Sequence, residues 1–488
     1  MDAHTVARDL GLWSNGRGSL HQKLTHALMR TIREGLLHPG LRLPSERQLA
    51  AALGVSRTTV VAAYDALRTA AWLESRAGSG TWVRARSSGV ATARTAPEVG
   101  PLAVSPLLSL LAHAQEEDFV NLALGTPLPL TDLPADLFHL PDDEYAALVH
   151  DPLYYPVGWP PLRRAIAAEY TKGGLDTTPE QVLVTNGAQQ AIALCAMLCL
   201  QRGDTALVED PAYFGALDAC RAIGARISPL PVEAGGVRPA AIRDRLTATG
   251  ARLIYLTPTF QNPTGAVMPL SARKDVARIV SEHGVPLIED GTLADVILEG
   301  SPPPPIAAFA PDGPVLTIGS ISKLVWSGLR VGWIRAAEPM IDRLARVKSA
   351  MDLGSPVLTQ AIATRLVAAT ATARQLRQQQ LKPRRNILTR LLREQLPEWT
   401  FRVPTGGLFL WVRLPDGDTR EFAQVALRHG VLILAGPTMS AQEQHARFLR
   451  LPFLAPADTI RQGITRLVSA WREYKTGDRP RRHHVVVA

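Results

Sequence analysis

The run "SISKLVWSGLR" brings hydroxyl, amine and guanidinium groups close together in the chain. It contains Ser320, Ser322 and Lys323, and Arg330 follows seven residues after the lysine. Two hydroxyls and an arginine can hold a phosphate group beside a reactive amine. A solvated surface turn would explain the same residues, so the run alone leaves both interpretations open.

The stretch "TNGAQQAI" is a second place where a phosphate could bind. Its glycine turn leads into an apolar helix, in which the N–H groups of Gly187, Ala188 and Gln189 would lack partners. Free N–H groups at the positive end of a helix bind anions. A capped turn without a ligand is the alternative interpretation.

Three more polar or aromatic residues follow short apolar runs. Tyr213 in "EDPAYFG" could stack on a flat ring, Asn262 in "QNPTG" could donate through its amide, and Asp290 in "IEDG" supplies a carboxylate. Taken singly, they also suit a core tyrosine, an Asx turn and a surface acid. Their order along the chain is more informative than any one of them.

Between residues 115 and 475 apolar runs alternate with helix-like stretches. "QVLVTNG", "TALVED", "RLIYLTPTF", "VPLIED" and "PVLTIGS" are aliphatic or β-branched, and stretches such as "SARKDVARIVSEHG" lie between them. This alternation predicts an α/β fold with a mostly parallel central sheet and helices on both faces. Ligands of such sheets bind beyond the carboxyl ends of the strands, so we expect the residues above to share one site.

Together, a phosphate cradle, a stacking ring, an amide donor, a carboxylate and a lysine with a nearby arginine describe a site for pyridoxal 5′-phosphate. A lysine amine holds the aldehyde of this cofactor as a Schiff base. A carboxylate beside the ring nitrogen keeps that nitrogen protonated, so that the ring can accept electrons. The sequence therefore predicts a pyridoxal phosphate site with Lys323 at its centre.

From Ser19 to Val83 the chain reads as three helices followed by a hairpin. Ser45 and Ser56 are suitable N-caps for the second and third helices, and the joint "LGVS" between them is short. Two short helices joined so tightly are typical of a helix-turn-helix. The strand, glycine-rich tip and strand in "LESRAGSGTWV" would form a wing beside it.

The start of the third helix is the predicted DNA-contacting surface, because a helix-turn-helix places the first turn of its second helix in the major groove. An arginine there can bond a guanine edge, and hydroxyls can reach phosphates. The candidate DNA-binding residues, including two in the wing, are Arg47, Ser56, Arg57, Thr58, Thr59, Arg76 and Gly78. A three-helix interaction module with an incidental basic face is the alternative.

The composition is that of a globular protein with a basic amino-terminal segment. The 488 residues suggest two or three domains. The net charge is +9, and the first 90 residues contain 12 Lys or Arg against 6 Asp or Glu, which favours a polyanion partner for this segment. Neither a membrane span nor a signal peptide is recognisable, so we expect a cytoplasmic protein that joins the nucleoid when bound to DNA. No metal site is expected, since nothing completes a ligand set around Cys195 and Cys199.

The segment "LPSERQLAAALGVSRTTVVAAYDALRTAAWLESRAGSGTWV" resembles the winged-helix domain of GntR-type bacterial regulators, and the later motifs resemble fold-type I aminotransferases. Over most of its length the chain is similar to the MocR branch of GntR-type regulators. The resemblance implies that Lys323 forms the Schiff base, Asp290 pairs with the pyridine nitrogen and Asn262 bonds the ring hydroxyl. It also implies that Tyr213 stacks on the ring. The phosphate would be held by Gly187, Ala188, Gln189, Ser320, Ser322 and Arg330.

The same resemblance extends to residues that would contact an effector or a second subunit. "ARFLRLPF" resembles the strand whose arginine binds a substrate carboxylate, which points to Arg450, with Arg447 as the alternative. Fold-type I domains build their sites at a dimer interface, so a homodimer is implied, and Tyr154 and Tyr155 are both candidates for contacting the neighbouring subunit's cofactor. Most relatives carry a tyrosine two residues after the aspartate, but this chain has Thr292, which puts the cofactor affinity in question.

The expected domains are a winged helix-turn-helix at 15–84, a flexible linker at 85–114, an aminotransferase-like domain at 115–475 and a basic tail at 476–488. The large part of the aminotransferase-like domain would span 155–350, with a small part formed from its two ends. We expect a transcription regulator that binds a double-stranded DNA operator and senses pyridoxal phosphate, an amino acid or another amine, rather than a turnover enzyme. The alternatives are an active aminotransferase with an appended DNA-binding head, and a DNA-binding protein whose second domain is only a scaffold.

Overall fold

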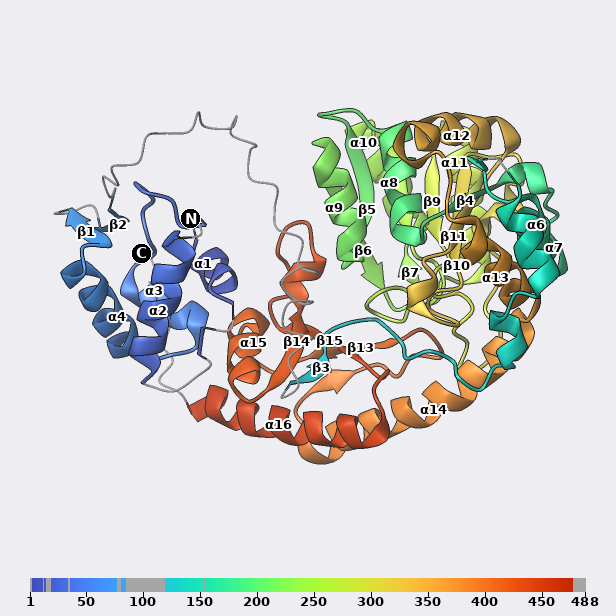
Figure 1. Cartoon of the computed structure of the whole chain (residues 1–488). Helices are drawn as coiled ribbons and strands as arrows, with labels where there is room; N and C mark the ends of the chain where they lie inside the picture. The colour runs from blue at the N-terminus through green and yellow to red at the C-terminus, as the bar shows by residue number, and fades with distance from the viewer. Residues whose placement is uncertain are drawn as a thin grey trace.

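The computed structural model describes residues 2–11, 13–14, 19–33, 36–76, 80–84, 119–151 and 154–476. These residues form an amino-terminal head, a large domain and a small domain (Figure 1). The predicted linker and the tail beyond residue 476 lie outside the described residues, so their boundaries stay predictions. No helix in the described part of the chain is long and apolar enough to cross a membrane.

The head contains the three predicted helices and the hairpin, with one further helix in front. Its elements are α1 (Ala3–Asp9), α2 (Leu20–Arg33), α3 (Glu46–Leu53), α4 (Arg57–Thr69), β1 (Leu73–Arg76) and β2 (Gly80–Val83). The side chains of Ser45 and Ser56 cap α3 and α4, as predicted. The sequence does not predict α1, because seven residues are too few to show a helical period.

An eight-stranded sheet forms the centre of the large domain, in the order β4-β11-β10-β9-β8-β5-β6-β7. Its strands are β4 (Val182–Thr185), β5 (Thr205–Asp210), β6 (Arg226–Glu233), β7 (Gly236–Val237), β8 (Leu253–Leu256), β9 (Leu287–Asp290), β10 (Val315–Ser320) and β11 (Gly332–Arg335). Adjacent strands from β10 to β6 pair in parallel, whereas β11 and β7 pair antiparallel with their neighbours. The five predicted apolar runs become β4, β5, β8, β9 and β10, which confirms the predicted fold class.

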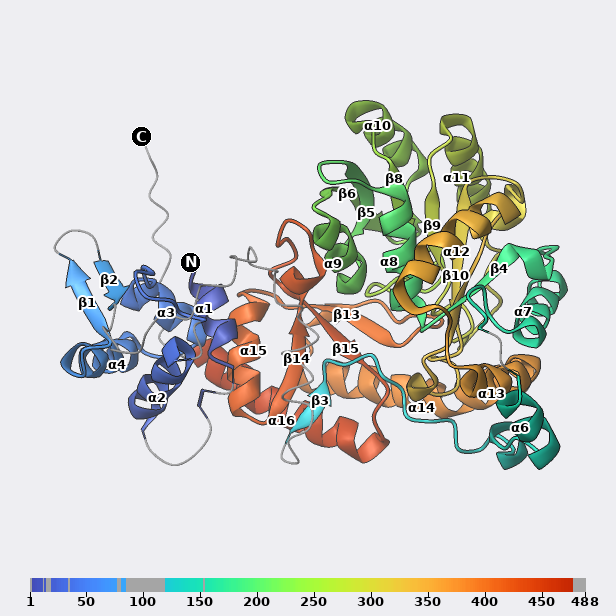
Figure 2. The same cartoon turned by 45° about the horizontal axis from the view of Figure 1, so that its top comes forward.

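Helices cover both faces of this sheet (Figures 1 and 2). The helices of the large-domain region are α6 (Asp142–Val149), α7 (Pro160–Lys172), α8 (Ala188–Cys199), α9 (Phe214–Ile223), α10 (Pro239–Thr249), α11 (Leu270–His283), α12 (Glu338–Asp352) and α13 (Val357–Ala368). In β8, Leu253 and Tyr255 pack with α8, α9 and α12, whereas Ile254 and Leu256 pack with α10 and α11. Because both faces are covered, inner strands such as β4 and β8 are buried along their whole length and carry mostly aliphatic side chains.

The small domain combines a five-stranded sheet, in the order β12-β13-β15-β14-β3, with three helices. Its elements are β3 (Val120–Leu122), α14 (Thr370–Gln395), β12 (Thr400–Phe401), β13 (Phe409–Arg413), α15 (Thr419–Arg428), β14 (Val431–Ala435), β15 (Phe448–Pro452) and α16 (Ala457–Thr476). Since β3 pairs in parallel with β14, this sheet takes strands from both sides of the large domain in the sequence. Short 3₁₀ helices are η1 (Ala135–Phe138), η2 (Pro179–Gln181), η3 (Ile306–Phe309), η4 (Ser327–Leu329) and η5 (Gly436–Met439).

Candidate functional site

The predicted cofactor residues follow five strands of the large sheet. The turn at Gly187 follows β4, Tyr213 follows β5, Asn262 follows β8, and Asp290 ends β9. Ser320 ends β10, and Lys323 lies just beyond it. The carboxyl ends of parallel strands meet at one edge of a sheet, so the fold brings these residues to a common edge.

Lys323 is half-buried at this edge, and its Nζ donates a hydrogen bond of 2.7 Å to the carbonyl oxygen of Gly125. Burial, together with the positive charges of Arg450 and Arg330, lowers the pKa of Lys323 to about 8, although the charge of Asp290 opposes this effect. An uncharged amine is the form that attacks an aldehyde carbon. The surroundings of Lys323 therefore make it more nucleophilic near neutral pH than an ordinary lysine.

A buried arginine that the sequence analysis does not single out holds the segment around Lys323. From α14, Arg377 donates through Nε to the carbonyl of Leu324 at 2.8 Å and through Nη2 to that of Val325 at 2.9 Å. Its Nη1 donates to the carbonyl of Leu128 at 3.0 Å. Arg377 thus connects Leu324 and Val325, which follow Lys323, to Leu128. Leu128 lies in the same segment as Gly125, whose carbonyl accepts the hydrogen bond from Lys323.

Asp290 receives hydrogen bonds on both carboxylate oxygens. The hydroxyl of Tyr255 in β8 donates to Oδ2 at 2.6 Å, and the N–H of Thr292 donates to Oδ1 at 2.9 Å. Burial raises the pKa of Tyr255 well above its usual value, so the hydroxyl stays protonated and continues to donate. Tyr255 lies within a predicted strand, and no sequence motif marks it as part of the site. The buried hydroxyl of Thr292 has no hydrogen-bond partner among the described residues.

The guanidinium of Arg330 packs against the turn before α8, where its Nη2 donates to the carbonyl of Asn186 at 3.2 Å. Gly187 has a φ of +80°, and a Cβ at this position would lie 2.8 Å from Nη2 of Arg330. The N–H of Gly187 donates to the carbonyl of Thr185 at 2.9 Å. The prediction of a free N–H at Gly187 therefore differs from the structure, in which this group already has a partner. The N–H groups of Ala188 and Gln189 lie in the first turn of α8, where a helix has no internal partners for them.

The two serines of the "SISK" run differ in their hydrogen bonds. Ser320 Oγ donates to the carbonyl of Val331 at 2.9 Å and accepts from the N–H of Ser322 at 3.2 Å. The hydroxyl of Ser322 and Oε1 of Gln189 are buried and have no partner among the described residues. An unpaired buried hydroxyl beside free N–H groups and an exposed arginine fits a phosphate, so these residues fit pyridoxal phosphate.

Arg450 is buried on β15 and connects the two domains at the site. Its Nη1 donates to Oδ1 of Asn262 at 3.1 Å, and its Nη2 donates to the carbonyl of Ala123 at 2.7 Å. The guanidinium carbon lies 4.1 Å from the centre of the Phe409 ring, and Nε has no partner among the described residues. The exposed Arg447 instead donates to the carbonyl of Pro415, away from these groups.

The three predicted tyrosines lie in different environments. Tyr213 is the N-cap of α9 and packs on Phe214, and burial raises the pKa of Tyr213 to about 12. Tyr154 has 77% of its surface exposed. Tyr155 is half-buried, and its hydroxyl donates to the carboxylate of Asp151. Tyr213 is also half-buried, and its hydroxyl lies within range of the charges of Asp290, Arg450 and Arg330.

Of the predicted DNA-binding residues described on the head, Ser56, Arg57, Thr58 and Thr59 lie at the start of α4, whereas Arg47 lies in the first turn of α3. Arg47, Ser56, Arg57 and Thr58 are exposed, whereas Thr59 is half-buried. The hydroxyls of Thr58 and Thr59 both lie within hydrogen-bond distance of Ser56 Oγ, at 2.7 and 2.9 Å. Thr59 is thus the least accessible of the set. The side chain of Arg76 and all of Gly78 lie outside the described residues.

A basic residue absent from the predicted set accompanies the wing. Arg42 forms an isolated bridge with Trp82 of β2, and it is exposed. Its guanidinium lies beside Gly80, where a Cβ would be 3.1 Å from Nε. The proline after Leu43 and the absence of any periodic pattern give the sequence no signal for this bridge to the wing.

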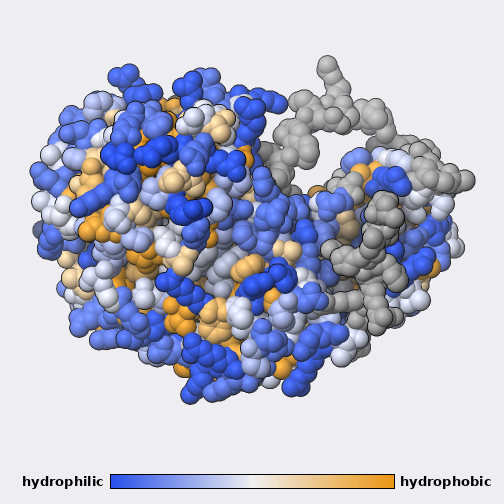
Figure 3. Space-filling view, turned by 180° about the vertical axis from the view of Figure 1, so that it is seen from behind, coloured by the Kyte–Doolittle hydropathy of each residue, from blue (hydrophilic) through white to orange (hydrophobic). Residues whose placement is uncertain are grey.

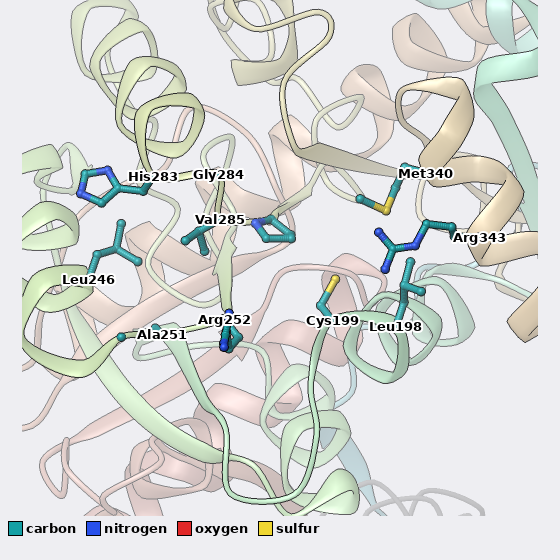
Figure 4. Close-up of a pocket in the computed structure, with 12 residues that line it drawn as sticks. Leu198, Cys199, Leu246, Ala251, Arg252, His283, Gly284, Val285, Met340 and Arg343 are labelled. Atoms are coloured by element: carbon teal, nitrogen blue, oxygen red, sulfur yellow. The ribbon is translucent and has the colours of Figure 1, made fainter.

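A hollow of about 390 Å³ lies at the opposite edge of the large sheet (Figure 4). Arg252 and Pro286, which come directly before β8 and β9, line it together with Cys199 and Arg343. Ligands of parallel sheets bind at the carboxyl ends of the strands, and none of the predicted site residues lines this hollow. It is therefore separate from the candidate site.

Two family models match the chain. The model described as "Aminotransferase class I and II" matches residues 153–467, and the one described as "Bacterial regulatory proteins, gntR family" matches residues 20–83. The probable rhizopine catabolism regulatory protein MocR of Rhizobium meliloti is 32% identical over 469 residues, which cover 93% of this chain and 94% of that protein. The uncharacterized HTH-type transcriptional regulator YdfD of Bacillus subtilis is 29% identical over 92% of this chain and 95% of its own length.

A solved structure resembles the carboxyl-terminal part. The α-aminoadipate aminotransferase LysN of Thermus thermophilus, complexed with N-(5′-phosphopyridoxyl)-L-leucine, has a TM-score of 0.69 and 28% identity, and the match covers 77% of this chain and 96% of that chain. These likenesses imply pyridoxal phosphate as the cofactor and DNA as the partner of the head. The chain therefore belongs to the MocR-type regulators of the gntR family, in which a winged helix-turn-helix is joined to an aminotransferase domain of class I and II.

Proposed function

We propose that this regulator holds pyridoxal phosphate through Lys323, and that the cofactor, or an amino acid or amine that reacts with it, sets the affinity of the head for an operator. The observation that supports the proposal is that Asp290, Arg330 and Arg450 lie close enough to Lys323 at the carboxyl edge of the sheet for their charges to change its pKa. In an enzyme this site would serve turnover. Attached to a DNA-binding head, it can serve as a sensor.

The cofactor, when bound, supplies an aldehyde that condenses with amines and a ring that accepts electrons. Lys323 would offer its amine to that aldehyde. The carboxylate of Asp290, fixed by Tyr255 and by the N–H of Thr292, would hold a proton on the ring nitrogen. The remaining contacts would come from Tyr213 on the ring, from Asn262 at its hydroxyl, and from Ala188, Gln189, Ser322 and Arg330 at the phosphate. Gly187, without a side chain, would leave room for Arg330 beside that turn, and Ser320 would position Ser322.

Arg450 would bind the carboxylate of an amino-acid effector. Its buried Nε has no partner among the described residues, and its pKa is lowered to about 9 by burial. A carboxylate would supply both the missing hydrogen bond and the missing negative charge. Effectors with a carboxylate should therefore bind more tightly than simple amines.

The protein would act as a homodimer on an operator with two half-sites. Several large apolar side chains are exposed on α6, on α13 and around residues 154 and 353. These segments lie near one another, since α13 contacts α6 and Gly354 lies against the backbone of Tyr155. The exposed side chains are Tyr145, Val149, Tyr154, Met351, Leu353 and Leu358. Exposed apolar clusters of this kind mark interaction surfaces. Figure 3 shows one face of the molecule, on which apolar and polar side chains are mixed. Two subunits would present two heads, each with Arg47, Ser56, Arg57 and Thr58 exposed.

A DNA-shift assay tests the proposal. The operator fragment would be titrated with cofactor-free protein, with pyridoxal phosphate alone, and with pyridoxal phosphate plus each of a series of amino acids and amines. The proposal expects the apparent Kd to change with at least one addition, and Lys323→Ala to abolish that change. Equal affinity under every condition would refute ligand control, because a ligand can act only through different affinities for two states.

A second candidate function is that of a working aminotransferase with an appended head. It is favoured by the lowered pKa of Lys323, since an amine that titrates near pH 8 can also carry protons during transamination. Sustained conversion of an amino acid in the presence of a 2-oxo acid would support this function. A single turnover per site would favour the sensor.

A further inference from the structure

The small domain contacts the turn of the helix-turn-helix through one arginine at the end of α15. Arg428 donates through Nη1 to the carbonyl of Leu53 at 3.0 Å and through Nη2 to that of Gly54 at 2.9 Å. These are the last residue of α3 and its C-cap. Carbonyls at the end of a helix lack partners within the helix, so Arg428 supplies hydrogen bonds that the head cannot make for itself.

A carboxylate on α16 holds Arg428 in this position. Nη2 of Arg428 lies 2.6 Å from Oε1 of Glu473, and Nε2 of His429 lies 2.7 Å from the other oxygen, Oε2. The Arg428 side chain is only 14% exposed. A guanidinium fixed by a carboxylate and bonded to two carbonyls has little freedom, so the contact is directional.

The turn of the head is shaped to fit against α15. Gly54 has a φ of +60°, and a Cβ at this position would lie 3.0 Å from Cγ2 of Val425. A larger residue would be both strained and crowded there. Elsewhere the head and small domain are less tightly packed, because a cavity of about 290 Å³, lined by Ala7 of α1 and Gln424 of α15, lies between them.

The docked turn lies next to the DNA-contacting residues. α4 begins at Arg57, three residues after Gly54, and Ser56 caps it. Arg57 and Thr58 remain exposed. The position of Gly54 on α15 therefore sets the position of the DNA-contacting end of α4.

α15 belongs to the same packed unit as Arg450. Residues of α15, β14 and β15 share one hydrophobic core, which includes Val425, Ile433 and Leu449. Leu434 of β14 pairs with Arg450 of β15. Because a packed core moves as a unit, a displacement of Arg450 would carry α15 and the turn of the head with it. α15 lies against the head in both views (Figures 1 and 2).

We propose that the face of α15 that carries Val425 and Arg428 is the docking surface for the turn of the DNA-binding head. Arg428 is the positioning residue through which a ligand bound at Arg450 changes the affinity for DNA. This coupling rests on the proposed function for its ligand. The docking contact itself does not.

Hydrogen exchange of the full-length, cofactor-free protein tests the docking contact. The N–H groups of Gly54 and Val55 bond the carbonyls of Ala51 and Ala50, so their exchange reports opening of the turn. Arg428→Gln should speed their exchange about tenfold, because two hydrogen bonds from a charged donor are lost. The matched control is Arg472→Gln, which removes the same charge from an exposed residue of α16. It should leave these amides unchanged.

Equal exchange in Arg428→Gln and wild type would overturn the docking surface. If Arg428→Gln does not fold, Glu473→Gln keeps both carbonyl contacts but removes the carboxylate that holds the guanidinium. Glu473→Gln should speed the exchange of Gly54 and Val55 by a smaller factor, and in that case unchanged exchange in Glu473→Gln would overturn the proposal.

A second measurement tests the coupling. With pyridoxal phosphate present throughout, the ratio of operator Kd with and without each of a series of amino acids would be compared in wild type, Arg428→Gln and Arg472→Gln. We expect the ratio to move toward 1 in Arg428→Gln alone, with cofactor absorbance unchanged in all three. A full response in Arg428→Gln would overturn the coupling. If the wild type itself shows no response, the proposed ligand control fails, and the exchange experiment still decides the docking surface.

Discussion

Arg450 of the small domain donates a hydrogen bond of 3.1 Å to the side-chain oxygen of Asn262, in the turn after β8 of the large domain. This bond occupies the amide oxygen of Asn262 and leaves its NH₂ group to face a ligand. It also places the one buried cation of β15 beside the cofactor residues. A ligand carboxylate at Arg450 would therefore act on both domains at once.

Replacing Arg450 by Gln should weaken the binding of amino acids at least about tenfold, because a charge-assisted pair with a carboxylate is lost. Amines of similar size without a carboxylate should bind almost as tightly as they do to wild type. The measurement is a titration of the cofactor absorbance with matched pairs of amino acid and decarboxylated amine. A similar loss for both members of a pair would mean that Arg450 has only a structural role.

Replacing Arg377 by Gln should lower the free energy of unfolding by about 2–4 kcal/mol, because buried carbonyls lose their donors. The matched control is Arg390→Gln on the same helix, where the side chain is 60% exposed. Urea unfolding of the cofactor-free protein measures both effects. If Arg377 also positions Lys323, Arg377→Gln should shift the pH titration of the cofactor band, and Arg377→Lys should partly restore it. An unshifted titration would reduce Arg377 to a stabilising residue.

The reaction of cofactor-free protein with pyridoxal phosphate should depend on pH through Lys323. Its pKa lies at about 8 rather than 10.5, so the uncharged fraction of the amine rises about tenfold per pH unit below 8 and levels off above it. The unfolded chain binds more protons between these two values, so this group also makes stability rise with pH across that window. Stopped-flow absorbance measures the rate. A rate that continues to rise to pH 10 would contradict the lowered pKa.

Replacing Arg57 by Ala should relax sequence preference at one base position in each half-site, at a cost of about 1–3 kcal/mol. Arg84, an exposed residue just after the wing, provides the comparison. Arg84→Ala should weaken binding to all sequences alike and reduce the salt dependence by about one unit of slope. Binding to a panel of single-base operator variants at two salt concentrations distinguishes the two. If Arg57→Ala keeps the base preference of the wild type, Arg57 does not contact the bases.

The sequence predicts the framework of the site because that framework is local. Strands buried on both faces are largely apolar, and the functional residues lie at their carboxyl ends or in the turns that follow, as with Asp290, which ends the strand that begins at Leu287. The N-caps Ser45 and Ser56 are also local signals, since a cap bonds groups within three residues.

The residues that the sequence does not reveal act over long separations in the chain. Arg377 bonds the carbonyl of Leu128, 249 residues away, and Arg428 bonds that of Leu53, 375 residues away. Neither Arg377 nor Arg428 lies in a recognisable motif. Since an arginine in a helix usually faces solvent, the sequence gives no reason to expect that either one is buried. Tyr255 reads as an ordinary strand residue, and only the pairing of β8 with β9 brings it to Asp290. Such roles depend on the tertiary fold.

The central claim is that Lys323 holds pyridoxal phosphate, although Thr292 stands where the resemblance to aminotransferases implies a tyrosine. Its most direct test is the visible absorption spectrum of wild type beside Lys323→Ala, each incubated with pyridoxal phosphate and desalted, before and after borohydride. The account predicts a band in the wild type alone, which borohydride removes while fixing the cofactor to Lys323. A wild type without the band after this incubation would contradict the account.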